Sequence, residues 1–333
     1  MKPLVSILIP AYNAEKWIGD TIRSALAQTW PQKEVIIVDD GSNDQTRAIA
    51  LKFAGAGIKV ITQYNHGAAV ARNTAFKACK GDYIQWLDAD DLLAPDKIEK
   101  QMVARQRCQS TRTLLSSAFG TFLFRPARAT FSPTPLWCDL SPIEWMLRNL
   151  ERKYWMQTAA WIVSRELTET VGPWDSRLLG DDDGEYFFRV VRASDAVSFV
   201  PESKVFYRKP GPGNLSYVGL SPKKLEAQWL SMQLHVSHIR SLEDSPRVRS
   251  ACLKYLQDYM ICFYPEMSSI VEQAEQLAAA LGGRLVKPQF SWKYVWIQRL
   301  FGWSAAKRSQ VAYNFLKGSL RRSRDNTLFR LGL

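Results

Sequence analysis

The chain has 333 residues, 46% of them hydrophobic, so it is long enough for about two domains with well-filled cores. Its formal net charge of +12 could suit nucleic acid, an anionic membrane surface or a phosphorylated substrate. However, residues 287–333 hold ten Lys or Arg and one acid, a net of +9, which leaves only +3 for the rest of the chain. The basic charge therefore belongs to this tail and says little about the remainder.

The cysteines and the apolar runs bear on the cellular location of the protein. Five scattered cysteines form no CxxC pair, which argues against a disulfide scaffold or a zinc site. The apolar run before Pro10 is only about six residues long, too short for a signal peptide. No apolar stretch approaches the ~20 residues of a membrane span. We expect reduced thiols and a cytoplasmic location, with contact to a membrane surface left open.

Strands alternate with helices over the first hundred residues. Helical spacing of apolar residues predicts helices after residue 13, after residue 44, over residues 67–79 and after Pro95. Apolar, β-branched runs predict buried strands between them, over residues 4–9, 34–38, 58–62 and 82–87. This alternation predicts βαβ units and an α/β fold with a doubly wound, mostly parallel twisted sheet.

The pattern changes after the first hundred residues. Strands are expected over residues 114–124, 159–164, 196–200 and 204–208, and a proline-rich loop over residues 126–142. From near Pro222 to the end the chain has long helical stretches, which follow a turn-rich segment at residues 209–214. We therefore predict an α/β domain over residues 1–215 and a helical, basic and aromatic extension over residues 216–333.

Polar and acidic side chains follow the predicted strands where a ligand would bind. In doubly wound sheets ligands lie beyond the carboxyl ends of the strands. Carboxylates there suit Mg²⁺ or Mn²⁺ bridging a diphosphate, or the hydroxyls and N–H groups of a nucleoside. A solvated loop with helix caps is the alternative for each cluster alone, but their shared edge favours a site. The residues concerned are Tyr12, Asp39, Asp40, Asp88, Asp90 and Asp91.

Four strings of the sequence are specific enough to compare with known families. In chain order they are VSILIPAYNAEKWIGDTIRSALAQTW, EVIIVDDGSNDQT, NHGAAVARNTAFKACKGDYIQWLDADD and GPWDSRLLGDDDGEYFFR. Across residues 3–210 their order and spacing resemble the family 2 glycosyltransferases, which have the GT-A fold. The resemblance implies an inverting, metal-dependent enzyme of cell-surface polysaccharide synthesis. Such an enzyme moves a sugar from a nucleotide-diphosphate sugar, most often a UDP-sugar, to a hydroxyl of a glycan or lipid-linked acceptor.

The resemblance also implies roles for individual residues. The DxD element of the family falls on Asp88 and Asp90, with Asp91 adjacent, and we expect Asp90 and Asp91 to hold Mn²⁺ or Mg²⁺. Arg72 matches a basic contact near the nucleotide. The residues expected to bind the nucleotide sugar are Pro10, Ala11, Tyr12, Asp40, Arg72 and Asp88.

The catalytic base is expected in a later motif. Family members usually show Glu-Asp, then x-(Asp/Glu) and an aromatic run that ends in Arg, which matches residues 182–189 here. Asp183 takes the position of the base, and Asp182 replaces the usual glutamate. Because Asp181 precedes them, a register error of one residue stays open, and acids are also common in the first turn of an ordinary helix. Asp183 would take the proton of the acceptor hydroxyl during a single in-line displacement, which inverts the anomeric carbon.

The tail combines aromatic and basic residues. On one helix Trp292, Trp296, Leu300 and Trp303 would form a stripe, which suits an interfacial helix on anionic lipid. A helix packed on the catalytic domain is the alternative. Nucleic-acid binding is disfavoured because the chain shows no nucleic-acid module, and we predict no such partner. A catalytically inactive nucleotide-sugar-binding protein of the same fold is the rival function.

Overall fold

The computed structural model describes residues 2–55, 57–209 and 221–332. In the described part a mixed sheet has the order β3-β2-β1-β4-β8, in which β1, β2, β3 and β4 run parallel and β8 antiparallel to β4. The doubly wound, mostly parallel sheet predicted from the sequence is therefore present. The strands are β1 (Val5–Ala11), β2 (Lys33–Asp39), β3 (Ile58–Thr62), β4 (Tyr83–Trp86) and β8 (Val163–Ser164). The connecting helices are α1 (Ile18–Leu26), α2 (Thr46–Leu51) and α3 (Ala68–Ala78).

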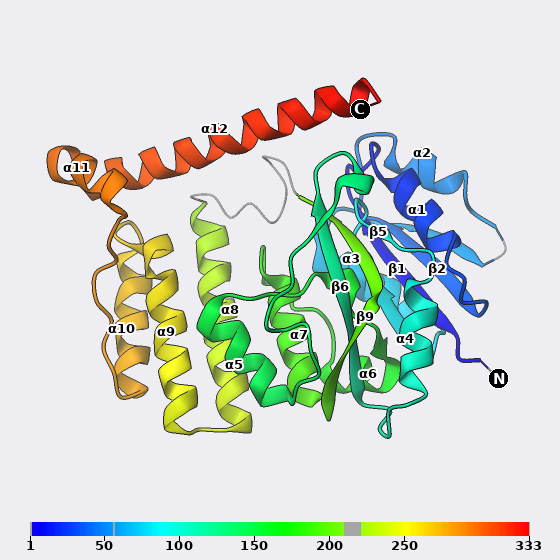
Figure 1. Cartoon of the computed structure of the whole chain (residues 1–333), viewed down its shortest axis with the longest axis horizontal. Coiled ribbons are helices and arrows are strands. Elements are labelled where there is room, and N and C mark those ends of the chain that lie inside the picture. Colours follow the sequence, from blue (N-terminus) through cyan, green and yellow to red (C-terminus); the bar gives the residue numbers. More distant parts are fainter. Residues whose placement is uncertain (1, 56, 210–220, 333) are drawn as a thin grey trace.

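A second sheet packs beside the first and has the order β5-β9-β6-β7 (Figure 1). Its strands are β5 (Leu92–Leu93), β6 (Thr113–Phe122), β7 (Thr130–Phe131) and β9 (Ala196–Arg208). The two short strands expected at 196–200 and 204–208 are one strand, because β9 keeps its pairing with β6 across a register shift beside Ser117 and Ala118. Helix α4 (Lys97–Arg105) leads from β5 to β6.

Several short elements depart from the sequence-based expectation. Residues 159–164 form a 3₁₀ turn, Thr158–Ala160, followed by the two-residue strand β8. Helix α5 (Pro142–Arg152) was not predicted, although Ser141 caps it by accepting from the Glu144 N–H at 3.4 Å and Pro142 occupies its first turn. A further 3₁₀ turn, Pro126–Arg128, precedes β7. Helices α6 (Arg165–Val171) and α7 (Asp182–Ala193) complete this half of the molecule.

The C-terminal helices stack against the sheet-containing half. They are α8 (Pro222–Leu242), α9 (Pro246–Phe263) and α10 (Ser268–Ala280), and they stand beside α5 and α7 (Figure 1). Their buried apolar residues belong to the same hydrophobic cluster as those of the sheets. The predicted helical extension is thus present and packs on the α/β half. The domain boundary predicted near residue 215 lies outside the described residues.

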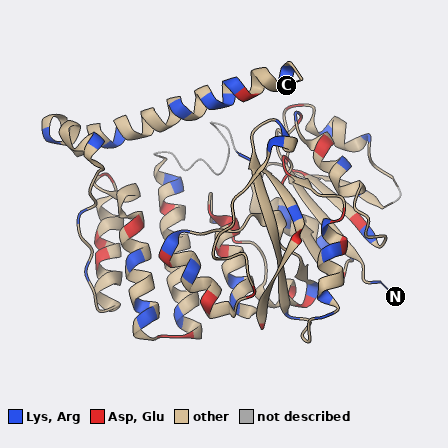
Figure 2. Cartoon of the chain, viewed as in Figure 1, with Lys and Arg blue, Asp and Glu red and all other residues tan. Residues whose placement is uncertain are grey.

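The basic tail forms α11 (Trp292–Phe301) and α12 (Trp303–Arg330), separated by Gly302 with φ +83°. This break corrects the predicted stripe, because Trp303 turns inward to Phe290 and Tyr264 while Trp292, Trp296 and Leu300 stay exposed. Helix α12 crosses the molecule toward the α/β half, and cations line it (Figures 1 and 2). In the part of the chain that the structure describes, no helix combines the length and the apolarity that a bilayer crossing requires.

Candidate active site

The carboxyl ends of β1, β2 and β4 lie next to one another, because β1 pairs with both other strands. Pro10 and Ala11 are the last residues of β1 and are buried beneath this edge. Tyr12 follows them with 47% of its surface exposed, so its ring is available for stacking on a planar ligand. The structure therefore brings the residues predicted at the strand ends to one edge of the sheet.

Asp39 and Asp40 at the end of β2 have opposite surroundings. Asp40 accepts hydrogen bonds from Gln63 Nε2 at 2.7 Å and from the backbone N–H groups of His66 and Gly67 at 3.0 and 2.8 Å. It thereby holds the segment that leads into α3. Asp39 is 1% exposed, and neither of its carboxylate oxygens has a hydrogen-bond partner among the described residues. Such acceptors are costly when left without a donor, and Asp39 lacks the hydrogen-bond partners that Asp40 has.

Arg72 on α3 joins the acids of β4 to those of α7. Its guanidinium donates to Asp88 at 2.8 Å and to Asp182 at 2.6 Å, and it stacks 4.3 Å from the Trp174 ring centre. Burial alone would lower the pKa of Arg72, but the charges of Asp182 and Asp88 outweigh it and raise the pKa. Arg72 therefore stays charged and fixes two acidic segments that are far apart in the sequence.

The three aspartates after β4 differ in what they can bind. Asp88 and Asp90 are partly exposed, and the pKa of Asp90 is raised to about 6 by burial and by the charge of Asp88. Asp91 is fully buried; its carboxylate accepts from the Arg208 N–H at 2.8 Å and from the Gln157 side-chain amide. Asp91 thus ties this turn to β9 and to the segment before the 3₁₀ turn. Both its oxygens accept hydrogen bonds, which departs from the expectation that Asp91 holds the cation together with Asp90.

This geometry bears on the predicted cation. Asp88 and Asp90 are neighbouring carboxylates whose mutual repulsion a divalent cation would relieve, and hard oxygen ligands are those that Mg²⁺ and Mn²⁺ take. No cluster of three or more His, Cys, Asp or Glu side chains suited to a metal exists within residues 2–55, 57–209 and 221–332. The donor set therefore fits a cation held by one or two carboxylates together with substrate phosphates.

Asp182 and Asp183 begin α7 but occupy different environments. Asp182 is buried and paired with Arg72. Asp183 is half-buried, and its Oδ2 accepts from the Thr158 hydroxyl at 3.2 Å. Burial, then the charges of Asp182 and Asp181, raise the pKa of Asp183 to about 7. A carboxylate with such a pKa is suited to accept a proton near neutral pH, whereas the paired Asp182 is not placed to do so.

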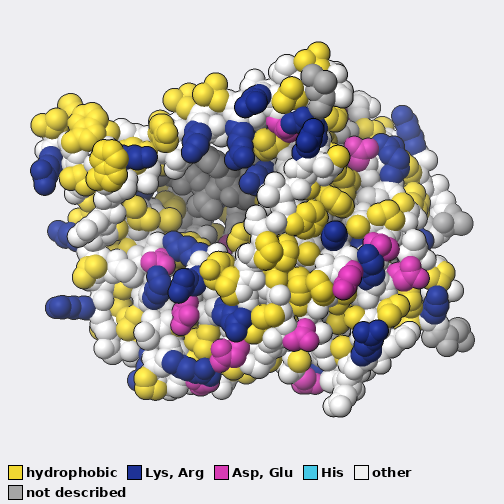
Figure 3. Space-filling model, viewed as in Figure 1, with side chains coloured by type: hydrophobic (Ala, Val, Ile, Leu, Met, Phe, Trp, Pro, Cys, Tyr) yellow, Lys and Arg dark blue, Asp and Glu magenta, His cyan; other side chains and the backbone are white. Residues whose placement is uncertain are grey.

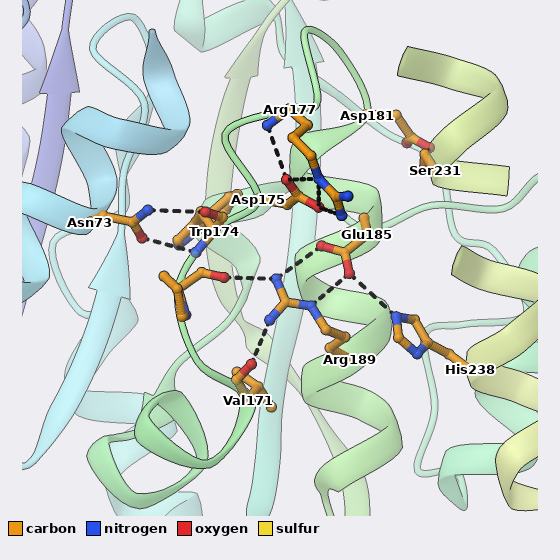
Figure 4. A network of polar contacts seen from close by, with 11 residues as sticks. Asn73, Val171, Trp174, Asp175, Arg177, Asp181, Glu185, Arg189, Ser231 and His238 are labelled. Atoms are coloured by element: carbon orange, nitrogen blue, oxygen red, sulfur yellow. Dashed lines mark hydrogen bonds and ion pairs between the residues drawn. The ribbon is translucent and has the colours of Figure 1, made fainter. Parts of the chain in front are cut away.

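The segment before α7 is held from three sides (Figure 4). Arg189 donates to the carbonyls of Val171 and Pro173 and pairs with Glu185 at 2.6 Å. Asn73 exchanges two hydrogen bonds with the backbone of Trp174, at 3.0 and 2.9 Å.

The third anchor comes from α8, where Ser231 donates to Asp181 at 2.6 Å and His238 lies 3.3 Å from Glu185. Trp174 is 2% exposed and stacks on Tyr186 in the core, with ring centroids 4.0 Å apart. These contacts hold the start of α7 in place from α3 and α8 and from within α7 itself.

Tyr207 on β9 is a site residue that sequence reasoning missed. Its pKa is raised by burial and then by the charges of Asp91, Asp183, Asp88 and Asp90. The hydroxyl therefore stays protonated and can donate a hydrogen bond. That the two acidic clusters, which the sequence separates by more than ninety residues, meet in space is shown by Arg72, which pairs with both Asp88 and Asp182. A tyrosine inside a predicted strand carries no sequence signal for this role.

Comparisons with known proteins match the N-terminal part of the chain to one family. The model of the glycosyl transferase family 2 matches residues 6–106. WfgD of Escherichia coli, a UDP-Glc:α-D-GlcNAc-diphosphoundecaprenol β-1,3-glucosyltransferase, is 46% identical over 100 residues, 30% of this chain and 40% of that protein. TuaG of Bacillus subtilis, a glycosyltransferase assigned to teichuronic acid biosynthesis, is 46% identical over 104 residues, 30% of this chain and 41% of that protein. The chain thus spans less than half the length of these curated relatives.

Two solved structures share the fold over most of the chain. TarS 1–349 of Staphylococcus aureus has a TM-score of 0.61 at 17% identity, covering 84% of this chain and 79% of that one. The mannosyltransferase PcManGT of Pyrobaculum calidifontis, solved with GDP-Man and Mn²⁺, has a TM-score of 0.54 at 18% identity and covers 84% and 76%. The predicted GT-A fold class and the resemblance to family 2 glycosyltransferases are both confirmed.

Proposed function

We propose, on the premise that residues 6–106 are a family 2 glycosyltransferase domain, that this chain is an inverting glycosyltransferase of cell-surface polysaccharide synthesis. It transfers a sugar from a nucleotide-diphosphate sugar to a hydroxyl of a glycan or lipid-linked acceptor. The observation that carries this proposal is the Arg72 guanidinium, which pairs with Asp88 after β4 and with Asp182, the neighbour of Asp183, at the ligand edge of the sheet. TarS has been solved with UDP-GlcNAc, and WfgD by its name uses UDP-Glc, which favours a UDP-sugar donor.

The donor site is proposed at the ends of β1, β2 and β4. Tyr12 stacks on the base above Pro10 and Ala11, and the oxygens of Asp39 and Asp40 accept from the base or ribose, with Asp39 having both oxygens available. Arg72 holds Asp88 in place near the nucleotide.

Asp88 and Asp90 would hold Mn²⁺ or Mg²⁺, with Asp91 supporting the turn from behind rather than coordinating. A bound divalent cation would neutralise the negative charge that develops on the leaving diphosphate.

Asp183 is the proposed general base. With a pKa raised to about 7, a substantial part of the population is deprotonated at neutral pH and can take the acceptor proton as the new bond forms. Asp182 is paired with Arg72 at 2.6 Å, so that Asp183 is the neighbour left to face the acceptor. A single displacement from the opposite face of the sugar inverts the anomeric carbon and needs no second carboxylate nucleophile.

The test screens a panel of nucleotide sugars in the presence of Mn²⁺. The two readouts are the release of free nucleoside diphosphate and the rise in melting temperature. We expect one donor to be hydrolysed slowly and to raise the melting temperature, and Asp183→Asn to keep the stabilisation while losing turnover. Stabilisation without turnover in the wild-type protein, with all acceptor mixtures, would instead favour the inactive sugar-binding protein. No response to any donor would refute both.

The tail is proposed to attach the enzyme to anionic membranes. Trp292, Trp296, Leu300 and Phe301 of α11 are 57–80% exposed. Figure 3 shows hydrophobic side chains gathered with cations on the lobe that holds α11. Exposed aromatic residues among Lys and Arg suit a bilayer interface, where each basic residue contributes about 1 kcal/mol. A peripheral location of the enzyme, on the cytoplasmic side at the inner face of the plasma membrane, is part of this proposal.

Co-sedimentation measures this attachment directly. The full chain is expected to bind phosphatidylglycerol vesicles, less so at high salt, and to leave phosphatidylcholine vesicles in solution. Trp292→Ala with Trp296→Ala should reduce binding, whereas Leu242→Ala, exposed on the end of α8, should not. Equal partitioning into both vesicle types, or into neither, would mean that α11 serves another purpose.

A further inference from the structure

The C-terminal end of α12 docks on the α/β half through a specific set of contacts. Asp325, the one acid of residues 287–333, accepts from Arg125 Nε at 2.9 Å and from the Phe124 N–H at 3.0 Å. Phe329 packs on the Phe124 ring with centroids 6.1 Å apart. Helix α12 therefore extends from α11 across to the half that holds the candidate site, rather than ending in solvent (Figure 1).

This docking carries Arg322 to the rim of the acidic site. Arg322 precedes Asp325 by three residues, so both lie on the docked face. Its guanidinium donates to the Lys209 carbonyl and lies 5.7 Å from the Phe124 ring centre. Lys209 directly follows Arg208, whose Nε donates to the Asp90 carbonyl at 2.9 Å. Arg322 is thus connected to the DxD turn through two neighbouring residues, Lys209 and Arg208.

The surroundings of Arg322 differ from those of the other cations on α12. Arg321 and Arg324 are exposed, whereas Arg322 is partly buried. Burial lowers the pKa of Arg322, and the negative charge of Asp90 opposes that shift. Asp90 is also the carboxylate whose charge a divalent cation would neutralise. When a cation neutralises Asp90, the partly buried guanidinium of Arg322 needs another anion to offset its burial.

The anion that the proposed reaction brings to this point is the diphosphate of the donor. A guanidinium presents five N–H donors in a planar fork that matches phosphate oxygens. We propose that Arg322 binds the diphosphate of the nucleotide sugar and that docking of α12 completes the donor site. This inference rests on the proposed glycosyltransferase function. It assigns a substrate contact to the tail, which lies outside residues 6–106, the part of the chain that matches the family model.

Titration calorimetry with Mn²⁺ present tests the contact. The probe is whichever of UDP, GDP, CDP, ADP and dTDP binds the wild-type chain tightest, compared with its own nucleoside. Loss of a charge-assisted hydrogen bond predicts that Arg322→Ala weakens diphosphate binding roughly 10- to 100-fold. Nucleoside binding should change little. Arg321→Ala, the exposed neighbour, is the matched control and should bind like wild type, and Arg322→Lys should recover part of the affinity.

Asp325→Asn separates the contact from general stability. It releases the end of α12 while keeping Arg322, so we expect a similar loss of diphosphate affinity, and the double variant should be no weaker than either single one. Equal binding by Arg322→Ala and Arg321→Ala would overturn the contact. A parallel loss of nucleoside and diphosphate affinity would also overturn it, because the effect would then be structural. Absence of any nucleotide binding by the wild-type chain would overturn the proposed function itself.

Discussion

Replacing Asp183 with Asn tests the catalytic base most directly. The substitution keeps the shape and removes the proton acceptor, so we expect the transfer rate to fall by roughly 10²- to 10⁴-fold. Donor binding should survive, because the proposed nucleotide contacts lie at the ends of β1, β2 and β4. The assay is single-turnover transfer at saturating donor, which separates the chemical step from binding.

The rate of the same reaction should depend on pH through the ionisation of Asp183. Because burial and the charges of Asp182 and Asp181 raise the pKa of Asp183 to about 7, the wild-type rate should fall as the pH drops through that value. About half of the molecules are active at pH 7 and about a tenth at pH 6 if this single ionisation controls the rate. The rate of Asp183→Asn should lack this acidic limb.

Asp182→Asn is the control for the register of the motif. It removes a charge that raises the pKa of Asp183, so the acidic limb should move to lower pH. It also breaks the buried pair with Arg72, which costs stability but leaves the base present. The reasoning is refuted if Asp183→Asn transfers sugar at the wild-type rate, and the alignment is wrong by one residue if Asp182→Asn alone is inactive.

Three further predictions concern other residues. Asp39→Asn should weaken nucleotide binding by about 1–3 kcal/mol by calorimetry, and more than Asp40→Asn does, because only Asp39 has both oxygens without a partner; equal affinities would refute this. Tyr207→Phe should lower the transfer rate without lowering the melting temperature, since the charges of Asp91 and Asp183 act on the hydroxyl; a wild-type rate would show that the hydroxyl takes no part in transfer. Burial lowers the pKa of Lys97 far below its usual value, so the unfolded chain binds more protons and stability should rise with pH toward about 10.5. Urea unfolding of Lys97→Met between pH 7 and 10 should show a flatter rise, and an unchanged slope would count against a neutral Lys97.

The repeating local patterns of the first hundred residues made the sheet and its ligand edge predictable. A buried parallel strand needs a continuous apolar run, and the helix after it needs an apolar stripe, so β1 to β4 and their helices could be read in order. The rule that ligands bind beyond the carboxyl ends then assembled Tyr12, Asp40 and Asp88 into one site. The motif of residues 182–189 added Asp183 by resemblance alone.

Only the tertiary structure distinguished neighbours with the same chemistry. Asp90 and Asp91 are identical side chains in sequence, yet the Arg208 N–H and Gln157 engage one and leave the other at the rim. Which of Asp39 and Asp40 keeps free oxygens depends on backbone N–H groups 26 and 27 residues downstream of Asp40.

Arg208 of β9 and Asp325 of α12 make contacts with residues far away in the chain, for which a single sequence gives no distance information. A side chain's role follows from which partners fold against it, and those partners are set by packing between segments rather than by local pattern.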